Sequence, residues 1–361
     1  MENYCKMQAA GTTQRLQWID AMRGFSMLVV VFVHLLTWSN VTSGDSPLVS
    51  ALMTFWMPLF FFVSGFFSYR APSNWSRSKL SGIMKRKVQA QIIGAFFFCG
   101  LYGYVMNGHV SFANGLGAYW FTIVLFQMYI VYLVFSLLSR AIGRDISIPV
   151  MVIISILLCG SLFVYKYDFK VAWMFRWLNL AQYFQFFTLG LICNKYKDRF
   201  ARLLSDNQLF TAVMGGGVLS LLLMNSEWFS DRFVFLSSFN RNLVVRYCML
   251  LNVVCLFYRH SSVLSGDGKS ARLLCFIGRR TLDIYFIHFF FLPKVDEISG
   301  WLTSGNMIIF QIMYASILTC VVTAICLLIS SILRSSPAIA SWLFGEKSRQ
   351  ITSPIIENQN K

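Results

Sequence analysis

Charged residues are scarce in this chain of 361 residues, where they make up 13% of the sequence and only 15 of them are Asp or Glu. Hydrophobic residues make up 57%, and the mean hydropathy is +0.60. A soluble domain of this length cannot bury so much apolar surface. The shortage of charge therefore excludes an ordinary soluble protein and indicates that a lipid bilayer surrounds most of the chain.

Several organisational signals are also missing. The nine cysteines are scattered without paired spacing, so we expect no disulfide framework and no metal site. We also expect no permanently bound cofactor. No composition shift, fixed-period repeat or low-complexity tract divides the chain. We predict one membrane domain at 21–333, with a cytoplasmic segment at 1–20 and a cytoplasmic tail at 334–361. Asp20 and Arg23 interrupt the start of the first apolar run, which we expect to remain as an anchor.

Apolar segments of about 20 residues recur along the chain, and each is long enough to cross about 30 Å of hydrocarbon as a helix. Helices are expected because a segment in lipid must satisfy its own backbone hydrogen bonds. The sequence thus predicts an all-α, polytopic membrane protein with about ten transmembrane helices. The predicted segments are 21–38, 48–69, 88–106, 118–139, 148–165, 171–193, 209–228, 243–258, 272–293 and 307–333.

The net charge of +16 comes from Lys and Arg residues that alternate with the apolar segments and do not gather in one stretch. This distribution follows the positive-inside rule and argues against a nucleic acid partner. It predicts that both termini are cytoplasmic in a multi-pass protein of the cell membrane, the inner membrane if the source is bacterial. Most of the cations fall in predicted cytoplasmic segments: Lys6, Arg15, Arg23, Arg70, Arg77, Lys79, Lys85, Arg86, Lys87, Arg140, Arg144, Lys195, Lys197, Arg199, Arg202, Arg259, Lys269, Arg272, Arg279, Arg280, Arg334, Lys347, Arg349 and Lys361.

Ionisable residues inside a membrane are costly to bury, and each is a functional candidate for that reason. The first apolar segment and its entrance contain Asp20, Arg23 and His34. At about 100° per residue, His34 lies within about 20° of Arg23 and about 40° of Asp20 around a helix, so all three share one face. His34 is expected about 16 Å beyond Arg23 along the axis, in the outer half of the bilayer.

A neutral imidazole can accept a proton from a hydroxyl group, which makes His34 a candidate general base. Arg23 and Asp20 are further catalytic candidates on the same face. Structural alternatives remain, because His34 can hydrogen-bond between helices, and Asp20 and Arg23 are spaced as an ion pair at the helix entrance. The shared face favours the catalytic interpretation.

Two other segments carry polar residues that can surround such a centre. In the ninth segment Tyr285 and His288 share a broad helix face, whereas Asp283 points elsewhere. A histidine and a tyrosine that merely pack between helices explain this pattern equally well. In the second segment Ser64 next to Gly65 can place a hydroxyl against the first helix, although small residues in membrane helices often serve packing alone. We treat Ser64, Tyr285 and His288 as candidate supporting residues.

These residues belong to motifs that follow one another over nearly the whole chain. The motifs are Ile19 to Gly24 followed by His34, Phe60 to Gly65, the basic cluster Lys85 to Lys87, Trp120-Phe121, Phe187 to Gly190, and Gly278 to His288. Together they resemble the acyltransferase 3 family of integral membrane O-acyltransferases, which includes bacterial polysaccharide O-acetyltransferases. Because Trp120 belongs to one of the motifs, we add it to the supporting residues.

The resemblance implies a ten-helix catalytic domain that takes an acyl group, usually acetyl, from acyl-CoA and passes it to a sugar hydroxyl. In the family the first-segment histidine, here His34, is catalytic, and the arginine eleven residues before it, here Arg23, is required. The family's basic motif ahead of the third segment is usually an arginine pair followed by a proline. This chain instead has Lys85-Arg86-Lys87 and no proline.

Coenzyme A carries several phosphate charges, so we predict that the electropositive stretch at 70–87 binds acyl-CoA as co-substrate through Arg77, Lys85, Arg86 and Lys87. Topogenic charge alone explains these cations equally well.

The predicted reaction is O-acetylation of a cell-surface or lipid-linked carbohydrate, a polysaccharide modification of the cell envelope. Direct transfer and an acyl-histidine intermediate both fit the residues. A proton-coupled membrane carrier of a sugar-lipid or anionic metabolite is the alternative function. The sequence specifies neither the acceptor sugar nor the oligomeric state.

Overall fold

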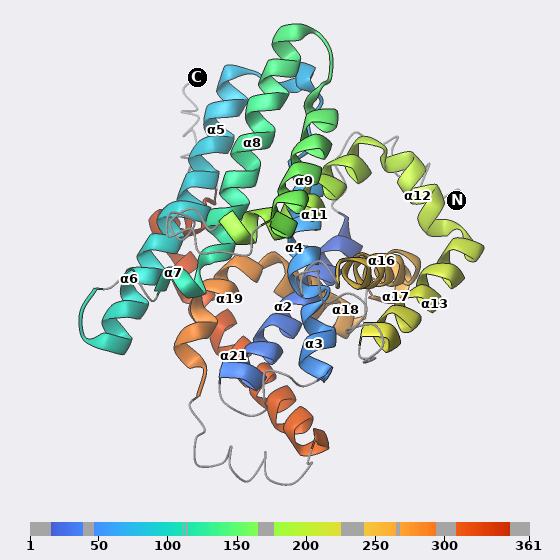
Figure 1. The fold of residues 1–361 in the computed structure, drawn as a ribbon. Helices are drawn as coiled ribbons and strands as arrows, with labels where there is room; N and C mark the ends of the chain where they lie inside the picture. Colours follow the sequence, from blue (N-terminus) through green and yellow to red (C-terminus); the bar gives the residue numbers. More distant parts are fainter. Residues whose placement is uncertain are drawn as a thin grey trace, which may run out of the picture.

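A computed structural model describes residues 16–38, 47–110, 112, 115–164, 177–224, 242–264, 268–293 and 308–346, and every regular element in these ranges is helical (Figure 1). The predicted all-α class is therefore confirmed. The elements are α2 (Gln17–Trp38), α3 (Pro47–Met53), α4 (Trp56–Ser68), η1 (Pro72–Asn74), α5 (Arg77–Lys87), η2 (Val88–Ile93), α6 (Gly94–Asn107), α7 (Gly115–Ala118), α8 (Trp120–Ile142), α9 (Ser147–Val164), α11 (Trp177–Lys195), α12 (Lys197–Ser205), α13 (Asn207–Met224), α16 (Leu243–Arg259), α17 (Ser261–Leu264), α18 (Lys269–Arg279), α19 (Thr281–Ile287), η3 (His288–Phe291), α21 (Ile308–Ser335) and α22 (Pro337–Phe344).

A helix occurs within each of the ten predicted segments, and 6 helices of the described part are long and apolar enough to cross a membrane. These are Gln17–Trp38, Pro47–Ser68, Arg77–Asn107, Trp120–Ile142, Asn207–Met224 and Ile308–Ser335. The multi-pass character of the protein is thereby supported, while the count of ten spans and the cytoplasmic side of the termini stay predictions. Residues 1–15 and 347–361 of the predicted terminal segments, and the ends of several predicted spans, lie outside the described residues.

The electropositive stretch at 70–87, which we expected to connect the second and third apolar segments, is helical for most of its length, because residues 77–87 form α5. The side chain of Ser76 caps this helix by accepting a hydrogen bond from the backbone nitrogen of Lys79 at 3.3 Å. The second predicted segment is divided into α3 and α4 at Thr54-Phe55. Pro58 has no N–H to donate to the carbonyl group of Thr54, which favours a break at this point.

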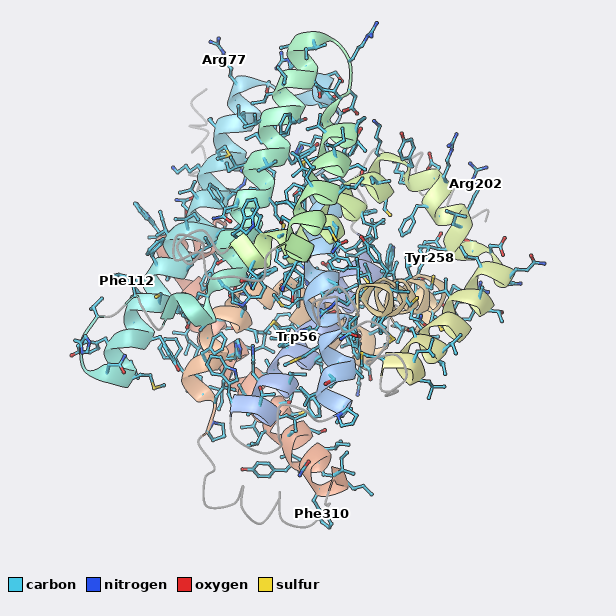
Figure 2. The ribbon with its side chains drawn as sticks, viewed as in Figure 1. Trp56, Arg77, Phe112, Arg202, Tyr258 and Phe310 are labelled. Atoms are coloured by element: carbon cyan, nitrogen blue, oxygen red, sulfur yellow. The ribbon has the colours of Figure 1, made fainter. Side chains whose placement is uncertain are left out.

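Large apolar side chains cover much of the outer surface of the bundle. The most exposed on α9, α13 and α21 lie between 65% and 70% accessible: Ile156, Leu157, Leu222, Ile309, Leu328 and Ile332. A surface of this kind is unstable in water and is the expected contact with lipid chains. Figure 2 shows side chains that extend outward from the helices, with Arg77 at the opposite end of the view from Phe310.

Two pairs of motif glycines bring helices into backbone contact. A Cβ atom added to Gly24 on α2 would lie 2.1 Å from the carbonyl oxygen of Leu274, and one added to Gly278 would lie 1.8 Å from that of Asp20. Only glycine allows α2 and α18 to approach so closely. The same relationship joins α4 to α11, because a Cβ atom on Gly190 would lie 2.0 Å from the carbonyl oxygen of Phe62.

The third long helix contains a π-helical segment, η2, between α5 and α6. Its backbone widens so that the nitrogen of Gly94 donates to the carbonyl oxygen of Gln89, five residues earlier. The C-terminal helix α22 packs against this segment, where a Cβ atom on Gly94 would lie 2.7 Å from the carbonyl oxygen of Leu343. Gly345, in the left-handed conformation at φ 64°, ends α22 beside the carbonyl group of Arg86.

Candidate active site

A cavity of about 260 Å³ lies along the first helix of the bundle. Arg23, Met27, Val30 and His34 line it, at the spacing of one face of α2. Its other walls come from α4, η2, α8 and the segment α19–η3, and include Trp56, which is labelled near the middle of the molecule in Figure 2. We call this space the His34 cavity. Arg23 and His34, which the sequence predicts to share one helix face, therefore line the same cavity.

The His34 side chain pairs with a second histidine. Its Nδ1 lies 3.0 Å from Nε2 of His288, and the two rings are nearly parallel, 5.2 Å apart between centroids. His288 is 0% exposed and its Nδ1 lies 2.9 Å from the backbone carbonyl oxygen of Ile284. The first and ninth apolar segments, separated by most of the sequence, therefore join through an imidazole pair.

The hydrogen bonds assign the positions of the protons on the two rings. A carbonyl oxygen can only accept, so Nδ1 of His288 carries a hydrogen. Nε2 of a neutral His288 is then an acceptor, and Nδ1 of His34 donates to it. This leaves the lone pair of a neutral His34 on Nε2. The neutral pair is the stable form, because burying adjacent imidazolium charges is costly.

Aromatic rings surround His34. The centroid of its ring lies 5.6 Å from Trp38, 5.3 Å from Trp56 and 5.1 Å from Phe289. All three line the His34 cavity, and Trp38 is 49% exposed, so the ring cluster reaches the surface of the described structure. The imidazole thus lies in an apolar setting that limits access of bulk water.

Arg23 contacts Thr281 and Asp20 at the other end of the cavity. Its Nη2 donates to the Thr281 hydroxyl at 2.9 Å, and its Nη1 lies 4.0 Å from the Asp20 carboxylate. Asp20 is 4% exposed and is not among the residues that line the cavity. The structure therefore places Asp20 beside Arg23 and apart from His34, in a position suited to orient the guanidinium group.

The predicted supporting residues fall in different places around the cavity. Ser64, Trp120 and Tyr285 line it, whereas His288 lies behind His34. The Tyr285 hydroxyl donates to the carbonyl oxygen of Ala118 at 3.0 Å and accepts from the backbone nitrogen of Phe121 at 3.2 Å. Tyr285 thereby fixes the start of α8, the helix that presents Trp120.

A second cavity, of about 200 Å³, adjoins the first. Arg23, Ser64, Gln91 and Leu125 line both, so the two share a wall. The cations that line this second space are Arg23, Arg70 and Lys87, and no carboxylate is among its lining residues. We call it the Lys87 cavity. Its charge suits an anionic group such as a phosphate.

Only one of the predicted donor-binding cations reaches this cavity. Lys87 lines it, with Nζ 3.9 Å from the centroid of the Tyr129 ring. Arg77, Lys85 and Arg86 precede it on α5 and are not among the residues that line either cavity. Arg77 and Lys85 are exposed, whereas the backbone carbonyl of Arg86 faces Gly345.

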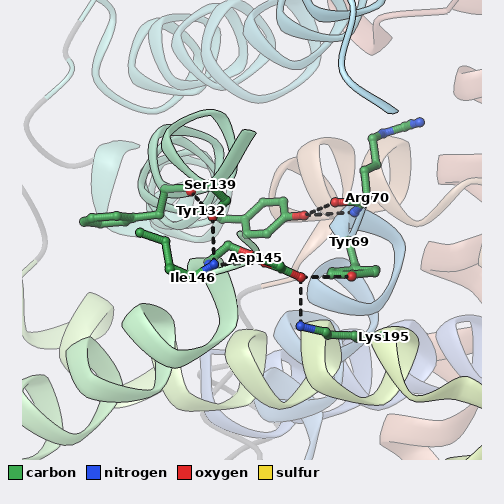
Figure 3. Close-up of polar contacts among 9 residues, drawn as sticks. Tyr69, Arg70, Tyr132, Ser139, Asp145, Ile146 and Lys195 are labelled. Atoms are coloured by element: carbon green, nitrogen blue, oxygen red, sulfur yellow. Dashed lines mark hydrogen bonds and ion pairs between the residues drawn. The ribbon is translucent and has the colours of Figure 1, made fainter. Parts of the chain in front are cut away.

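Arg70, which the sequence did not single out, is fixed at this cavity by the network in Figure 3. The Tyr132 hydroxyl accepts from the backbone nitrogen of Arg70 at 2.9 Å and donates to its carbonyl oxygen at 3.1 Å. Beside it, Asp145 accepts from Lys195 at 2.8 Å and from Tyr69 at 3.4 Å. The segment that follows α4 is therefore attached to α8 and to the α8–α9 corner.

The charge of Asp145 is stabilised within this network. Burial by itself raises the pKa of its carboxyl group, but hydrogen bonds from Lys195 and Ser147, together with the Lys195 charge, outweigh burial. The pKa of Asp145 consequently lies below its ordinary value. The carboxylate therefore stays ionised in mildly acidic conditions and maintains its ion pair with Lys195 at the α8–α9 corner.

Asp283 points away from the His34 cavity, as its spacing in the sequence predicts. It is 0% exposed and accepts two hydrogen bonds of 2.7 Å from Arg334 on α21, with Arg280 at 3.5 Å. This ion pair joins α19 to α21 and leaves Asp283 no part in the cavity. Within the described residues no group of three or more His, Cys, Asp or Glu side chains is arranged to hold a metal ion.

Sequence reasoning overlooked Gln91, Arg70 and the aromatic pair Trp38 and Trp56. Gln91 stands in an apolar segment, where a polar amide is itself a signal, but it belongs to no motif and is not ionisable. Arg70 was counted among the topogenic cations. Nothing in the sequence pattern distinguishes the two tryptophans from those that lie at membrane interfaces.

The fold and the cavities define a class of protein: a multi-pass helical membrane protein in which a half-buried histidine of the first helix lines a cavity that adjoins a second cavity lined by cations. A family model described as an acyltransferase domain matches residues 16–331, which is most of the chain. The chain therefore belongs to the acyltransferase 3 family, and it is a membrane acyltransferase. No curated protein and no solved structure matches it.

Proposed function

We propose that this protein transfers an acyl group, in the first instance acetyl, from acyl-CoA to a hydroxyl group of a cell-surface or lipid-linked carbohydrate. One observation carries the proposal: the His34 cavity shares a wall with the Lys87 cavity, which is lined by cations. A donor with an anionic head and a long thioester arm fits this arrangement. The acyltransferase family of the chain supports the same reaction type.

The donor's phosphates pair with Arg70 and Lys87 at the predicted cytoplasmic end, while its pantetheine arm extends along α2 past Arg23. Arg23 and His34 are eleven residues apart, about 16 Å along a helix axis. An extended pantetheine arm covers such a span and brings the thioester to the imidazole. The acceptor enters from the opposite end, where Trp38 and Trp56 offer flat rings against which a sugar can pack.

In the proposed reaction Nε2 of His34 takes the proton of the acceptor hydroxyl as its oxygen attacks the thioester carbonyl carbon. The carbon–sulfur bond breaks, the imidazolium returns the proton to the leaving thiolate, and the products are an ester and free CoA. His288 receives the Nδ1 hydrogen bond of His34 throughout and keeps the lone pair on Nε2. Arg23 balances negative charge near the donor.

The test uses purified protein in detergent, with acetyl-CoA labelled in the acetyl group and glycan extracted from cells that lack the protein. We expect label to enter the glycan and thiol to be released without any membrane gradient. His34→Ala should lower the rate by about 100-fold or more, because the base is lost. His260→Ala, in the exposed turn after α16 and outside both cavities, is the matched control and should retain the wild-type rate. Absence of label from the glycan overturns the proposed function, and full turnover by His34→Ala removes His34 from the mechanism.

A further inference from the structure

Gln91 stands at the junction of the two cavities. Its side chain lines both the His34 cavity and the Lys87 cavity, together with Arg23 and Ser64. Only 9% of the residue is exposed, so its carboxamide is enclosed by protein and by the cavity walls. Any donor arm that passes from the cation-lined entrance to His34 must therefore pass Gln91.

The carboxamide of Gln91 has an unused hydrogen-bonding group. Its Oε1 is buried and accepts no hydrogen bond from any described residue. A buried acceptor without a partner is costly, and the great majority of buried polar groups in proteins are paired. The Tyr129 hydroxyl, which belongs to a lining residue of the Lys87 cavity, is likewise buried and unpartnered within the described structure. The Gln91 Oε1 atom and the Tyr129 hydroxyl therefore both lack a hydrogen-bond partner within the described structure, and a bound ligand can supply one.

The backbone around Gln91 is π-helical, and this conformation sets the direction of the side chain. Gln91 lies within the π-helical segment η2, whose widened turn shifts the residues of the helix relative to those of a regular α-helix. The helix α22 packs closely against this segment at Gly94. Such π-helical insertions often occur at functional positions, because they reorient one side chain inside a continuous helix.

The chemistry of the donor supplies the missing partner. A pantetheine arm is an apolar chain interrupted by two secondary amides, each with one N–H donor and one carbonyl acceptor. A glutamine carboxamide offers the complementary acceptor and donor. We therefore propose that Gln91 recognises an amide of the pantetheine arm and so selects thioesters of coenzyme A over simpler thioesters. This inference rests on the proposed function, because it takes acyl-CoA as the donor.

The position of Gln91 favours the donor arm over the acceptor sugar as its ligand. Gln91 shares its wall with Arg23, at the end of the His34 cavity that adjoins Arg70 and Lys87. The acceptor hydroxyl has to meet His34, which lies about 16 Å from Arg23 along α2. A sugar ring at His34 is therefore remote from the amide of Gln91, whereas the middle of a pantetheine arm lies beside it.

Equilibrium binding to the purified full-length protein in lipid nanodiscs tests the proposal without any need for the acceptor. The two probes are coenzyme A and adenosine 3′,5′-bisphosphate, which keeps the nucleotide and lacks the arm. We expect Gln91→Met to weaken CoA binding about tenfold, since one hydrogen bond to the arm is lost, and to leave the binding of adenosine 3′,5′-bisphosphate unchanged. Arg70→Met should instead weaken both probes, because it removes a cation and leaves the arm contacts intact.

Gln127→Met is the matched control. Gln127 is another glutamine whose Oε1 is buried and unpartnered in the described structure, but it lines neither cavity. We expect it to bind both probes as the wild type does. Gln91→Asn, which keeps the amide and shortens its reach, should fall between the wild type and Gln91→Met for CoA alone. Retained binding of adenosine 3′,5′-bisphosphate shows that the Gln91 and Gln127 variants are folded.

The outcomes separate this inference from the function on which it rests. Failure of CoA to bind the wild-type protein overturns the proposed donor, and the inference falls with it. CoA binding that Gln91→Met leaves at the wild-type level overturns the inference alone. Equal loss of both probes in Gln91→Met, with Gln127→Met unaffected, also overturns it, because a structural defect of the entrance then explains the loss.

Discussion

Nδ1 of His34 and Nε2 of His288 lie 3.0 Å apart, and the far nitrogen of His288 is held by the carbonyl oxygen of Ile284. The chain of contacts runs from a fixed backbone group, through a fully buried ring, to a ring that lines a cavity. Because each link fixes the donor and acceptor of the next, the backbone of the ninth apolar segment determines which nitrogen of His34 is basic.

This relationship predicts that His288 acts by positioning His34. His288→Asn can still donate to the Ile284 carbonyl but is too short to accept from His34, and we expect the maximal rate to fall about 10- to 100-fold. His288→Gln carries its amide further out, can accept from His34 and should retain more activity. In both variants the KM for acetyl-CoA should stay near the wild-type value, because His288 does not line the cavity proposed to bind the donor's phosphates. Steady-state kinetics on labelled acetyl-CoA measures both quantities.

A purely structural role for His288 predicts a different result. Both variants would then lose activity in proportion to their loss of thermal stability, and the glutamine would rescue nothing. Comparing the two variants at matched fractions of folded protein distinguishes the cases. Equal rates for His288→Asn and His288→Gln contradict the positioning role.

The shared face of Arg23 and His34 could be predicted from the sequence because side chains on an α-helix repeat every 3.6 residues. Eleven residues return a side chain to nearly the same face, so Arg23 and His34 had to share a face once 17–38 was helical. Intramembrane charge then marked them as candidates. The contact of His34 with His288 could not be predicted in this way, because periodicity within one helix carries no information about which helices pack together.

Gln91 shows a second limit of sequence reasoning. Its orientation depends on η2, a π-helical segment that the apolar pattern of the sequence does not predict and against which α22 packs at Gly94. The basic cluster at 85–87 shows that adjacency in the sequence does not predict which side chains reach a cavity. Lys85, Arg86 and Lys87 are adjacent in sequence, but on a helix they point in different directions, and only Lys87 reaches the cavity.

The contact between α4 and α11 predicts a sharp size limit at Gly190. A Cβ atom at this position would lie 2.0 Å from the carbonyl oxygen of Phe62, which no side-chain rotation relieves, so Gly190→Ala must push the two helices apart. We expect a loss of about 2 kcal/mol or more in the free energy of unfolding. The measurement is the midpoint of thermal unfolding of the detergent-solubilised protein, followed by tryptophan fluorescence.

Gly215→Ala on α13 is the control for this prediction. Apart from its chain neighbours and the nearby backbone of its own helix, no atom of the described residues lies within 4 Å of a Cβ added there. The substitution should therefore be neutral or slightly stabilising through the higher helix propensity of alanine. A midpoint for Gly190→Ala equal to that of Gly215→Ala would show that α4 and α11 do not pack through their glycines.

The ion pair of Asp145 and Lys195 predicts how stability depends on pH at the α8–α9 corner. The pKa of Asp145 is lowered in the folded protein, so its stabilising contribution is complete above the unfolded value of about 3.9 and is lost as the pH falls through the folded value. Asp145→Asn should therefore lower the free energy of unfolding at pH 7 by about 0.5–1 kcal/mol, as expected for a partly exposed pair. Below about pH 4 the difference between variant and wild type should shrink.

Other carboxylates titrate in the same range, so the informative quantity is the difference between Asp145→Asn and the wild type at each pH. Asp198→Asn is the control, because Asp198 lies in the exposed first turn of α12 and forms no ion pair with any described residue. Its difference from the wild type should be small at pH 7. Thermal midpoints measured between pH 7 and pH 3 decide the matter. A deficit in Asp145→Asn that persists unchanged at pH 3 means that the carboxylate acts through neutral hydrogen bonds to Ser147, since the Lys195 attraction requires the ionised form.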